Sequence, residues 1–164
     1  MSTLQFIGEI MFYDSKGGRH ATVTEEGIYG FFDEYRFLSN FHVCNVVLDG
    51  LQFASSEAAY MACKTDDREL KYKLALMENP SDAKKFGREL DLRIDWDELK
   101  TYHMTRVLFA KFKQNDDLLA LLHATGNLYL EETNDWSDRY WGANQFGAGH
   151  NMLGKILMII RETI

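Results

Sequence analysis

Residues 96–113, WDELKTYHMTRVLFAKFK, carry the longest helical pattern in the sequence. Apolar side chains recur in this segment at intervals of three or four residues, at Leu99, Met104, Val107, Leu108 and Phe112. This spacing places them on one side of an α-helix, so the segment predicts an amphipathic helix with one face in the core.

Shorter periodic segments lie on both sides of this helix. Ser55 and Ser56 can cap a helix that runs to about Lys64, and Asn79 followed by Pro80 is typical of a helix start. Other helices are expected over 67–77, 116–124 and 151–164, and strands over 6–12, 28–32, 43–48 and 128–131, with turns at 15–18 and 49–50. The sequence therefore predicts an α+β class, a single helix-rich domain with a small sheet from the N-terminal half.

Composition excludes several classes of protein. The 164 residues include 18 Lys and Arg against 25 Asp and Glu, a formal net charge of −7, and 46% are hydrophobic. Such a chain can bury a core, which argues against disorder, collagen and coiled coil. Its longest aliphatic run, Ile156 to Ile160, is far shorter than the roughly 20 residues of a membrane span. With no secretion signal and with Cys44 and Cys63 expected as reduced thiols, we expect a cytoplasmic protein with no membrane partner.

The cysteines and histidines give no metal-binding pattern. The two cysteines form no CxxC pair, and the five histidines never fall at a metal-ligand spacing. We therefore expect neither a metal nor a cofactor.

Residues 142–149, GANQFGAG, are rich in glycine and precede the last expected helix. Gly147 and Gly149 permit close approach of the backbone, and the free N–H groups of a helix starting near Asn151 can hold a phosphate. The alternative is an ordinary loop capped by Asn151.

Residues 131–142 combine acids with large aromatic side chains, a mixture typical of a ligand-binding wall. The alternative is a solvated acidic loop anchored by Trp136 and Trp141. Glu57 is a second candidate, because apolar neighbours in a first helical turn can raise a carboxyl pKa and suit it to acid–base work. Its alternative role is to stabilise the helix dipole.

Several motifs, taken in order, resemble those of the NADAR family, the YbiA-like N-glycosidases. They span about Gly30 to Arg161 and are 37–41 (FLSNF), 56–65, 83–88 (AKKFGR), 92–96, Met104 with 110–112 (AKF), Leu130 with 132–142, and 149–158 with Arg161. No counterpart is found for residues 16–28, so 1–29 is expected to be a variable N-terminal elaboration of a NADAR-like domain covering 1–164.

The resemblance implies an α+β fold and hydrolysis of a C–N glycosidic bond at a phosphorylated ribose. It implies a substrate of one of two kinds, ADP-ribose on guanine bases of DNA or ribosylated riboflavin-pathway intermediates. The family's functional residues fall on Glu57, Lys64, Trp96 and Asp138. This sequence departs from the family pattern at Ala58 and Met61, where His and Gln are common on either side of an aromatic residue, here Tyr60, and at Ala143 and Asn144. A non-catalytic module that binds ADP-ribose is therefore retained as an alternative.

These considerations give one set of candidate site residues. Glu57 and Asp138 are expected to supply the acid and base in either order, and Lys64 to bind a phosphate or hydroxyl or to form a Schiff base with an opened ribose. The substrate-binding candidates are Ser39, Asn40, Phe41, Trp96, Glu132, Asn134, Trp136, Trp141, Gly142, Gly149 and Asn151. The expected partner is an ADP-ribose-type nucleotide sugar, and ADP-ribosylated DNA is one candidate source. Four basic residues form either a rim for DNA phosphates or a solvated helix face: Lys84, Lys85, Arg88 and Arg93.

Overall fold

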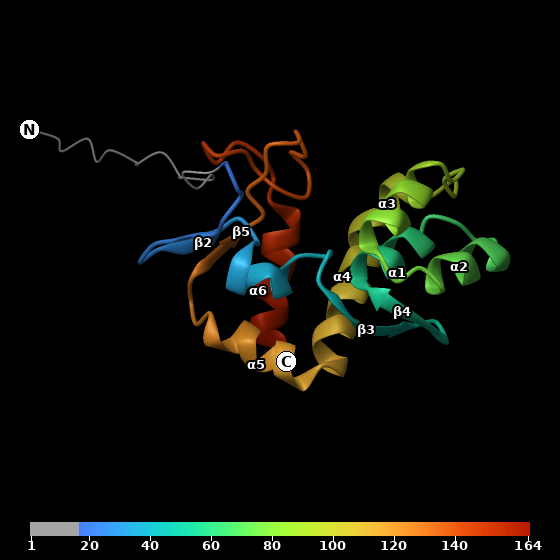
Figure 1. The fold of residues 1–164 in the computed structure, drawn as a ribbon, viewed down its shortest axis with the longest axis horizontal. Helices are drawn as coiled ribbons and strands as arrows, with labels where there is room; N and C mark the ends of the chain where they lie inside the picture. The colour runs from blue at the N-terminus through green and yellow to red at the C-terminus, as the bar shows by residue number, and fades with distance from the viewer. Residues whose placement is uncertain (1–16) are drawn as a thin grey trace, which may run out of the picture.

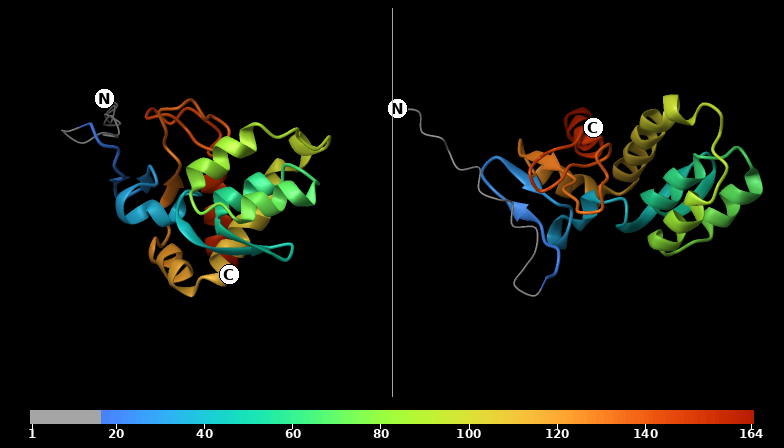
Figure 2. Two further views of the ribbon diagram at one scale, coloured as in Figure 1. Left: turned by 45° about the vertical axis from the view of Figure 1, so that its right-hand side comes forward. Right: turned by 90° about the horizontal axis from the view of Figure 1, so that it is seen from above.

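Six α-helices, one 3-10 helix and two small sheets form the computed structural model, which describes residues 17–164 (Figures 1 and 2). The helices are α1 (Ser56–Ala62), α2 (Arg68–Ala75), α3 (Pro80–Arg88), α4 (Trp96–Gln114), α5 (Asp116–Ala124) and α6 (Met152–Thr163), and η1 covers Asp33–Leu38. The expected strand at 6–12 lies outside the described residues. No helix in the part of the chain that is described is long and apolar enough to cross a bilayer.

Local sequence signals explain where the helices begin. The Ser55 hydroxyl accepts the N–H of Ala58 at the start of α1, and Asp67 and Asn79 cap α2 and α3 in the same way. Each cap satisfies backbone donors that the first helical turn leaves unpaired. The expected helices are confirmed, with α4 one residue longer at its C-terminal end than the sequence pattern indicated.

Two sheets form instead of one. Strand β2 (Gly27–Tyr29) pairs antiparallel with β1 (Thr22–Val23) and parallel with β5 (Tyr129–Glu131), while β3 (Val43–Leu48) and β4 (Leu51–Ser55) form a hairpin. The α+β class is thus confirmed, but one of the strands comes from the C-terminal half. Strand β2, from the stretch expected to be a variable elaboration, is the middle strand of its sheet.

Strand β4 and the 3-10 helix were not predicted from the sequence. The signal for β4 was present, because Asp49-Gly50 is a preferred pair for a two-residue hairpin turn. Both residues have positive φ, 50° and 79°, as that turn requires. Strand β4 of the hairpin ends directly at the start of α1, and the hairpin therefore fixes where Glu57 lies.

Helix α4 is the central element of the core. It contacts β3 and α1 on one side and α5 and α6 on the other. In Figure 1, α1, α2, α3 and the β3–β4 hairpin lie to one side of it, and β2, β5, α5 and α6 lie to the other. One continuous cluster of buried side chains, including Val107, Leu108 and Phe112 of α4, joins the two groups. The chain segments that meet between these groups form the candidate site.

Candidate functional site

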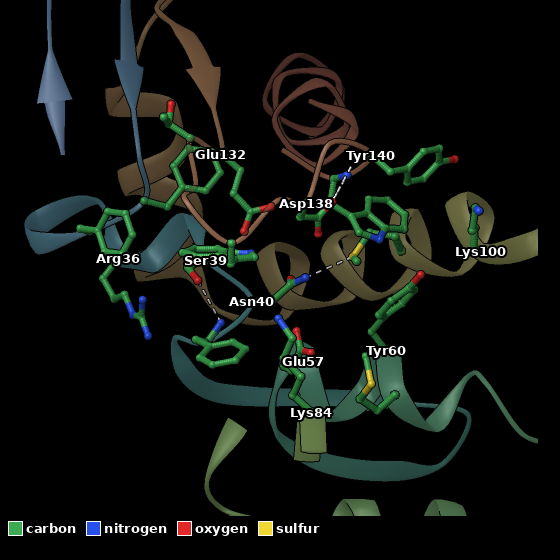
Figure 3. A pocket seen from close by; sticks show the side chains of 18 of the residues that line it. Arg36, Ser39, Asn40, Glu57, Tyr60, Lys84, Lys100, Glu132, Asp138 and Tyr140 are labelled. Carbon is green, nitrogen blue, oxygen red and sulfur yellow. Dashed lines mark hydrogen bonds between the residues drawn. The ribbon is translucent and has the colours of Figure 1, made fainter. Parts of the chain in front are cut away.

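A cavity of about 550 Å³ lies where α1, α3 and α4 meet the segment after β5 and the segment after η1. Its wall combines three carboxylates, several cationic side chains and a group of aromatic rings (Figure 3). A concave, mainly apolar site with a few convergent polar groups is the usual form of a small-molecule site.

Glu57 reaches this cavity from the first turn of α1. Its backbone N–H donates to the Asn40 carbonyl oxygen over 3.1 Å, which ties the helix start to the loop after η1. The side chain is only 5% exposed, and burial raises the pKa of Glu57 although Lys84 and Lys64 oppose that shift. Figure 3 shows its carboxylate directed into the cavity toward Asn40. Glu57 is therefore a desolvated carboxyl group available to a ligand.

Asp138 reaches the same cavity from the opposite wall, 81 residues later in the chain. Its Oδ1 accepts the backbone N–H groups of Tyr140 and Trp141, over 3.1 and 2.9 Å, so the carboxylate has a fixed orientation. Folding thus brings Glu57 and Asp138 to one cavity, as the sequence-based hypothesis required.

Glu132 is a third carboxylate of the cavity, and sequence reasoning had placed it among the substrate-binding residues. Burial, followed by the nearby charges of Asp138 and Glu57, raises the pKa of Glu132 to about 8. At neutral pH this carboxyl group therefore holds a proton that it can donate.

Cationic groups lie around these acids. Lys64 follows the C-terminus of α1, donates from Nζ to the Gly87 carbonyl oxygen over 3.3 Å, and lies 5.9 Å from the centre of the Trp96 ring. Burial, with Arg88 and Lys84 as further causes, lowers the pKa of Lys64. The guanidinium carbon of Arg36 and the Nζ of Lys84 lie 5.7 and 5.2 Å from the centre of the Phe41 ring. The cavity can thus attract an anionic ligand and still hold a neutral carboxyl group at Glu132.

Aromatic side chains form the remaining wall. The Tyr60 ring lies 5.2 Å from that of Trp96 and 5.6 Å from that of Trp141, so the three rings brace one another. Trp136 is 42% exposed at the cavity, with the Arg19 guanidinium 5.3 Å from its ring centre. Flat rings of this kind can stack on a base or border a sugar.

Ser39, Asn40 and Phe41 form the part of the wall that follows η1. The side-chain oxygen of Asn40 is buried without a hydrogen-bond partner among residues 17–164, so it can accept a hydrogen bond from a ligand. Lys111, which the sequence analysis missed as a site residue, supports this loop from behind. It is fully buried, and its Nζ donates to the Ser39 carbonyl oxygen over 2.9 Å. Its sequence signals were a lysine within an apolar helix face and its place in the AKF motif at 110–112.

Four candidate substrate-binding residues do not line the cavity: Asn134, Gly142, Gly149 and Asn151. Asn134 is buried behind the wall, where its amide bonds the backbone N–H and carbonyl of Asp138 over 3.1 and 2.8 Å. A Cβ at Gly142 would collide with the Glu132 carbonyl oxygen and the Asn134 amide, so only glycine permits this packing. These positions support the wall rather than form it.

The glycine-rich segment does not present a free helix N-terminus. The N–H groups of Met152 and Leu153, the first residues of α6, donate to the carbonyl oxygens of Tyr140 and Trp141. Asn151 bonds the backbone of Leu130 and Glu132 through its side chain. This geometry favours the ordinary-loop interpretation of residues 142–149 over the phosphate-binding one.

The proposed basic rim is divided between different places. Lys84 lines the cavity, and Lys85 and Arg88 are exposed on α3. Arg93 does not line this cavity and forms ion pairs with Asp66 and Asp95. Among residues 17–164, no group of three or more His, Cys, Asp or Glu side chains is arranged to hold a metal ion.

Asn134→Ala is expected to lower the free energy of unfolding by about 1–3 kcal/mol, because it removes a buried amide and leaves two half-buried backbone groups of Asp138 without these partners. Asn144→Ala is the matched control, since the Asn144 side chain accepts the N–H groups of Phe146 and Ala148 in a more exposed loop. Urea denaturation of both variants measures the difference. An equal loss of unfolding free energy in the two variants would show that Asn134 does not specifically stabilise the cavity wall.

Comparison with known proteins agrees with this architecture. Residues 23–164 match the NADAR domain. N-glycosidase YbiA of Escherichia coli is 34% identical over 147 residues, covering 87% of this chain and 91% of the relative. The NMR structure of Escherichia coli YbiA matches with a TM-score of 0.77 and 33% identity, over 87% of this chain and 86% of that one.

A riboflavin biosynthesis protein of Vibrio vulnificus is 33% identical over 98% of this chain, which spans 44% of the length of that relative. The family match covers all the helices around the cavity and every residue that lines it except Arg19. The chain belongs to the NADAR family.

Proposed function

We propose that this protein is an N-glycosidase that hydrolyses the C–N bond of an ADP-ribosyl or phosphoribosyl adduct. The observation that carries the proposal is the convergence of Glu57, Glu132 and Asp138 on one cavity with aromatic walls. Breaking a ribosyl C–N bond builds positive charge on the sugar and electron density on the leaving nitrogen. A catalyst therefore needs a carboxylate near the anomeric carbon and an acid near the nitrogen.

The three carboxyl groups can divide this work. Glu132 is suited to give its proton to the departing nitrogen, because its pKa of about 8 keeps it protonated at neutral pH. Asp138, oriented by two backbone N–H groups, can face the positive charge on the ribose. Glu57 then takes a proton from the water that attacks the anomeric carbon, and its raised pKa makes it a stronger base. A C–O bond replaces the C–N bond, and one proton moves at each end.

Lys64 has two roles open to it. Its ammonium form can bind a ligand phosphate or hydroxyl, and its neutral form, favoured by burial, can attack an opened ribose as an amine. Borohydride reduction during turnover separates the two, because only a Schiff base is trapped as a stable adduct on the protein.

Removal of ADP-ribose from guanine in DNA is the substrate assignment that we place first. The cavity wall offers aromatic faces for a base and the cationic Arg36, Lys84 and Lys100 for phosphates. Hydrolysis of riboflavin-pathway intermediates is the second assignment, supported by the name of the Vibrio vulnificus relative.

A direct assay tests the proposal. The purified protein is incubated with DNA carrying ADP-ribosylated guanine and, in parallel, with a ribosylaminopyrimidine phosphate, and the released sugar is measured. Release from the DNA supports the first assignment, and release from the pyrimidine alone supports the second. If neither is cleaved while ADP-ribose still binds, the protein is a binding module and the glycosidase proposal fails.

A further inference from the structure

A second cavity lies on the other face of α1. Its volume is about 960 Å³, and its walls come from the β3–β4 turn, α1, α2, Arg93 and α4. Helix α1 presents Glu57 and Tyr60 to the first cavity but Ala59 and Ala62 to the second. The two cavities are therefore separate sites divided by one helix.

The second cavity is strongly cationic in a chain of net charge −7. Two acids, Asp49 and Glu69, oppose five cationic side chains in its wall: Arg68, Lys71, Lys73, Arg93 and Arg106. Arg106 pairs with Asp49, and Arg93 pairs with Asp66 and Asp95. Within residues 17–164, the other three cations form no ion pair. Their charges are free to bind an anion with several negative charges.

A buried polar group without partners also belongs to this wall. His103 is only 6% exposed, and neither of its ring nitrogens has a hydrogen-bond partner in the described residues. Buried polar groups in native proteins are nearly always paired. Burial, followed by Arg93 and Arg106, lowers the pKa of His103, which favours the neutral ring with one donor and one acceptor. A ligand with both a charged and a neutral polar part would satisfy both features of the wall.

We propose that this second cavity binds a phosphate-bearing ligand, whose phosphate oxygens pair with Arg68, Lys71 and Lys73 and whose neutral polar part reaches toward His103. Guanidinium groups match phosphate oxygens in pairs, and several cations suit a polyphosphate or successive backbone phosphates. The site goes beyond the proposed function, because it shares no carboxylate with the first cavity. Free nucleotides and nucleic acid both carry this chemistry.

Calorimetric titration of the full chain at low salt tests the site, with sodium tripolyphosphate, ATP and a short single-stranded DNA as probes. The double variant Lys71→Glu, Lys73→Glu is expected to weaken binding at least about tenfold, because two attractive charges become repulsive. The matched control is Lys113→Glu, Lys155→Glu, which makes the same charge change at two exposed lysines outside both cavities. Binding of ATP alone identifies a free nucleotide, and binding of DNA alone identifies backbone phosphates.

Nuclear magnetic resonance separates this site from the first cavity. Probe binding is expected to shift the ring nitrogen signals of His103 and the amide signals of α2, while those of Glu57 and Asp138 stay in place. No binding of any probe at millimolar concentration would overturn the proposal. Equal weakening by the two charge-reversal pairs would also overturn it, as would shifts confined to the first cavity.

Discussion

Glu57→Gln is expected to lower kcat by about 10²–10⁴ fold, the usual contribution of a positioned acid or base, while the affinity for ADP-ribose changes by less than about threefold. Glutamine has nearly the same size and shape as glutamate, but it carries no charge and takes up no proton. The fold and the ligand contacts should therefore persist, while the base that accepts a proton from water is lost. Product release measures turnover, and calorimetric titration with ADP-ribose measures binding.

Glu98→Gln is the control for this experiment. Glu98 is exposed in the first turn of α4 and lies outside the cavity, so the same chemical change there should leave kcat unaltered. Unchanged turnover in the Glu57→Gln variant would contradict the mechanism. A parallel loss of affinity and turnover would instead assign Glu57 to ligand binding.

Glu132→Gln is expected to lower kcat by a similar factor and to remove the alkaline limb of the pH profile. In the wild-type protein the proton on Glu132 is lost as the pH rises through about 8, so kcat should fall about tenfold for each further pH unit. Glutamine has no proton to donate at any pH, and the residual activity should be flat over this range. Steady-state kinetics from pH 6 to about 9.5 record both profiles.

Glu131→Gln provides a matched control from the adjacent position. Glu131 is buried in β5, and its Oε1 accepts the Thr133 hydroxyl over 2.7 Å, but it does not line the cavity. Its substitution should leave the alkaline limb in place. A limb that survives in Glu132→Gln would show that another group supplies the proton.

The same glutamate affects stability with a definite sign. Because the pKa of Glu132 is raised in the folded state, the folded protein keeps a proton that the unfolded chain releases once the pH exceeds the ordinary glutamate value, and this difference costs folding energy. That cost grows until the pH reaches about 8 and then stays constant. Glu132→Gln removes it, so the variant should melt a few degrees above the wild type at pH 8 and show little difference at pH 4. A lower melting temperature at pH 8 would contradict this placement of the charge.

The fold was largely predictable because most of its signals are local. The apolar spacing of residues 96–113 gave α4, the Asn79-Pro80 pair gave the start of α3, and Glu57 was expected in the first turn of α1. Strand β4 was missed because its five residues become a strand through pairing with β3, although the Asp49-Gly50 turn was visible. The pairing of β2 with β5 across about 100 residues has no local signal at all.

The sequence by itself determined the helices, their caps and, through family resemblance, which carboxylates to consider, because these depend on residue type and on short-range spacing. Only the tertiary structure decided that Glu57, Glu132 and Asp138 share one cavity and that Asn134 and Asn151 stand behind it. It also raised the pKa of Glu132 and brought the cationic side chains of the second cavity together around His103. Burial and the proximity of charges set these properties, and both arise from contacts between segments that lie far apart in the chain.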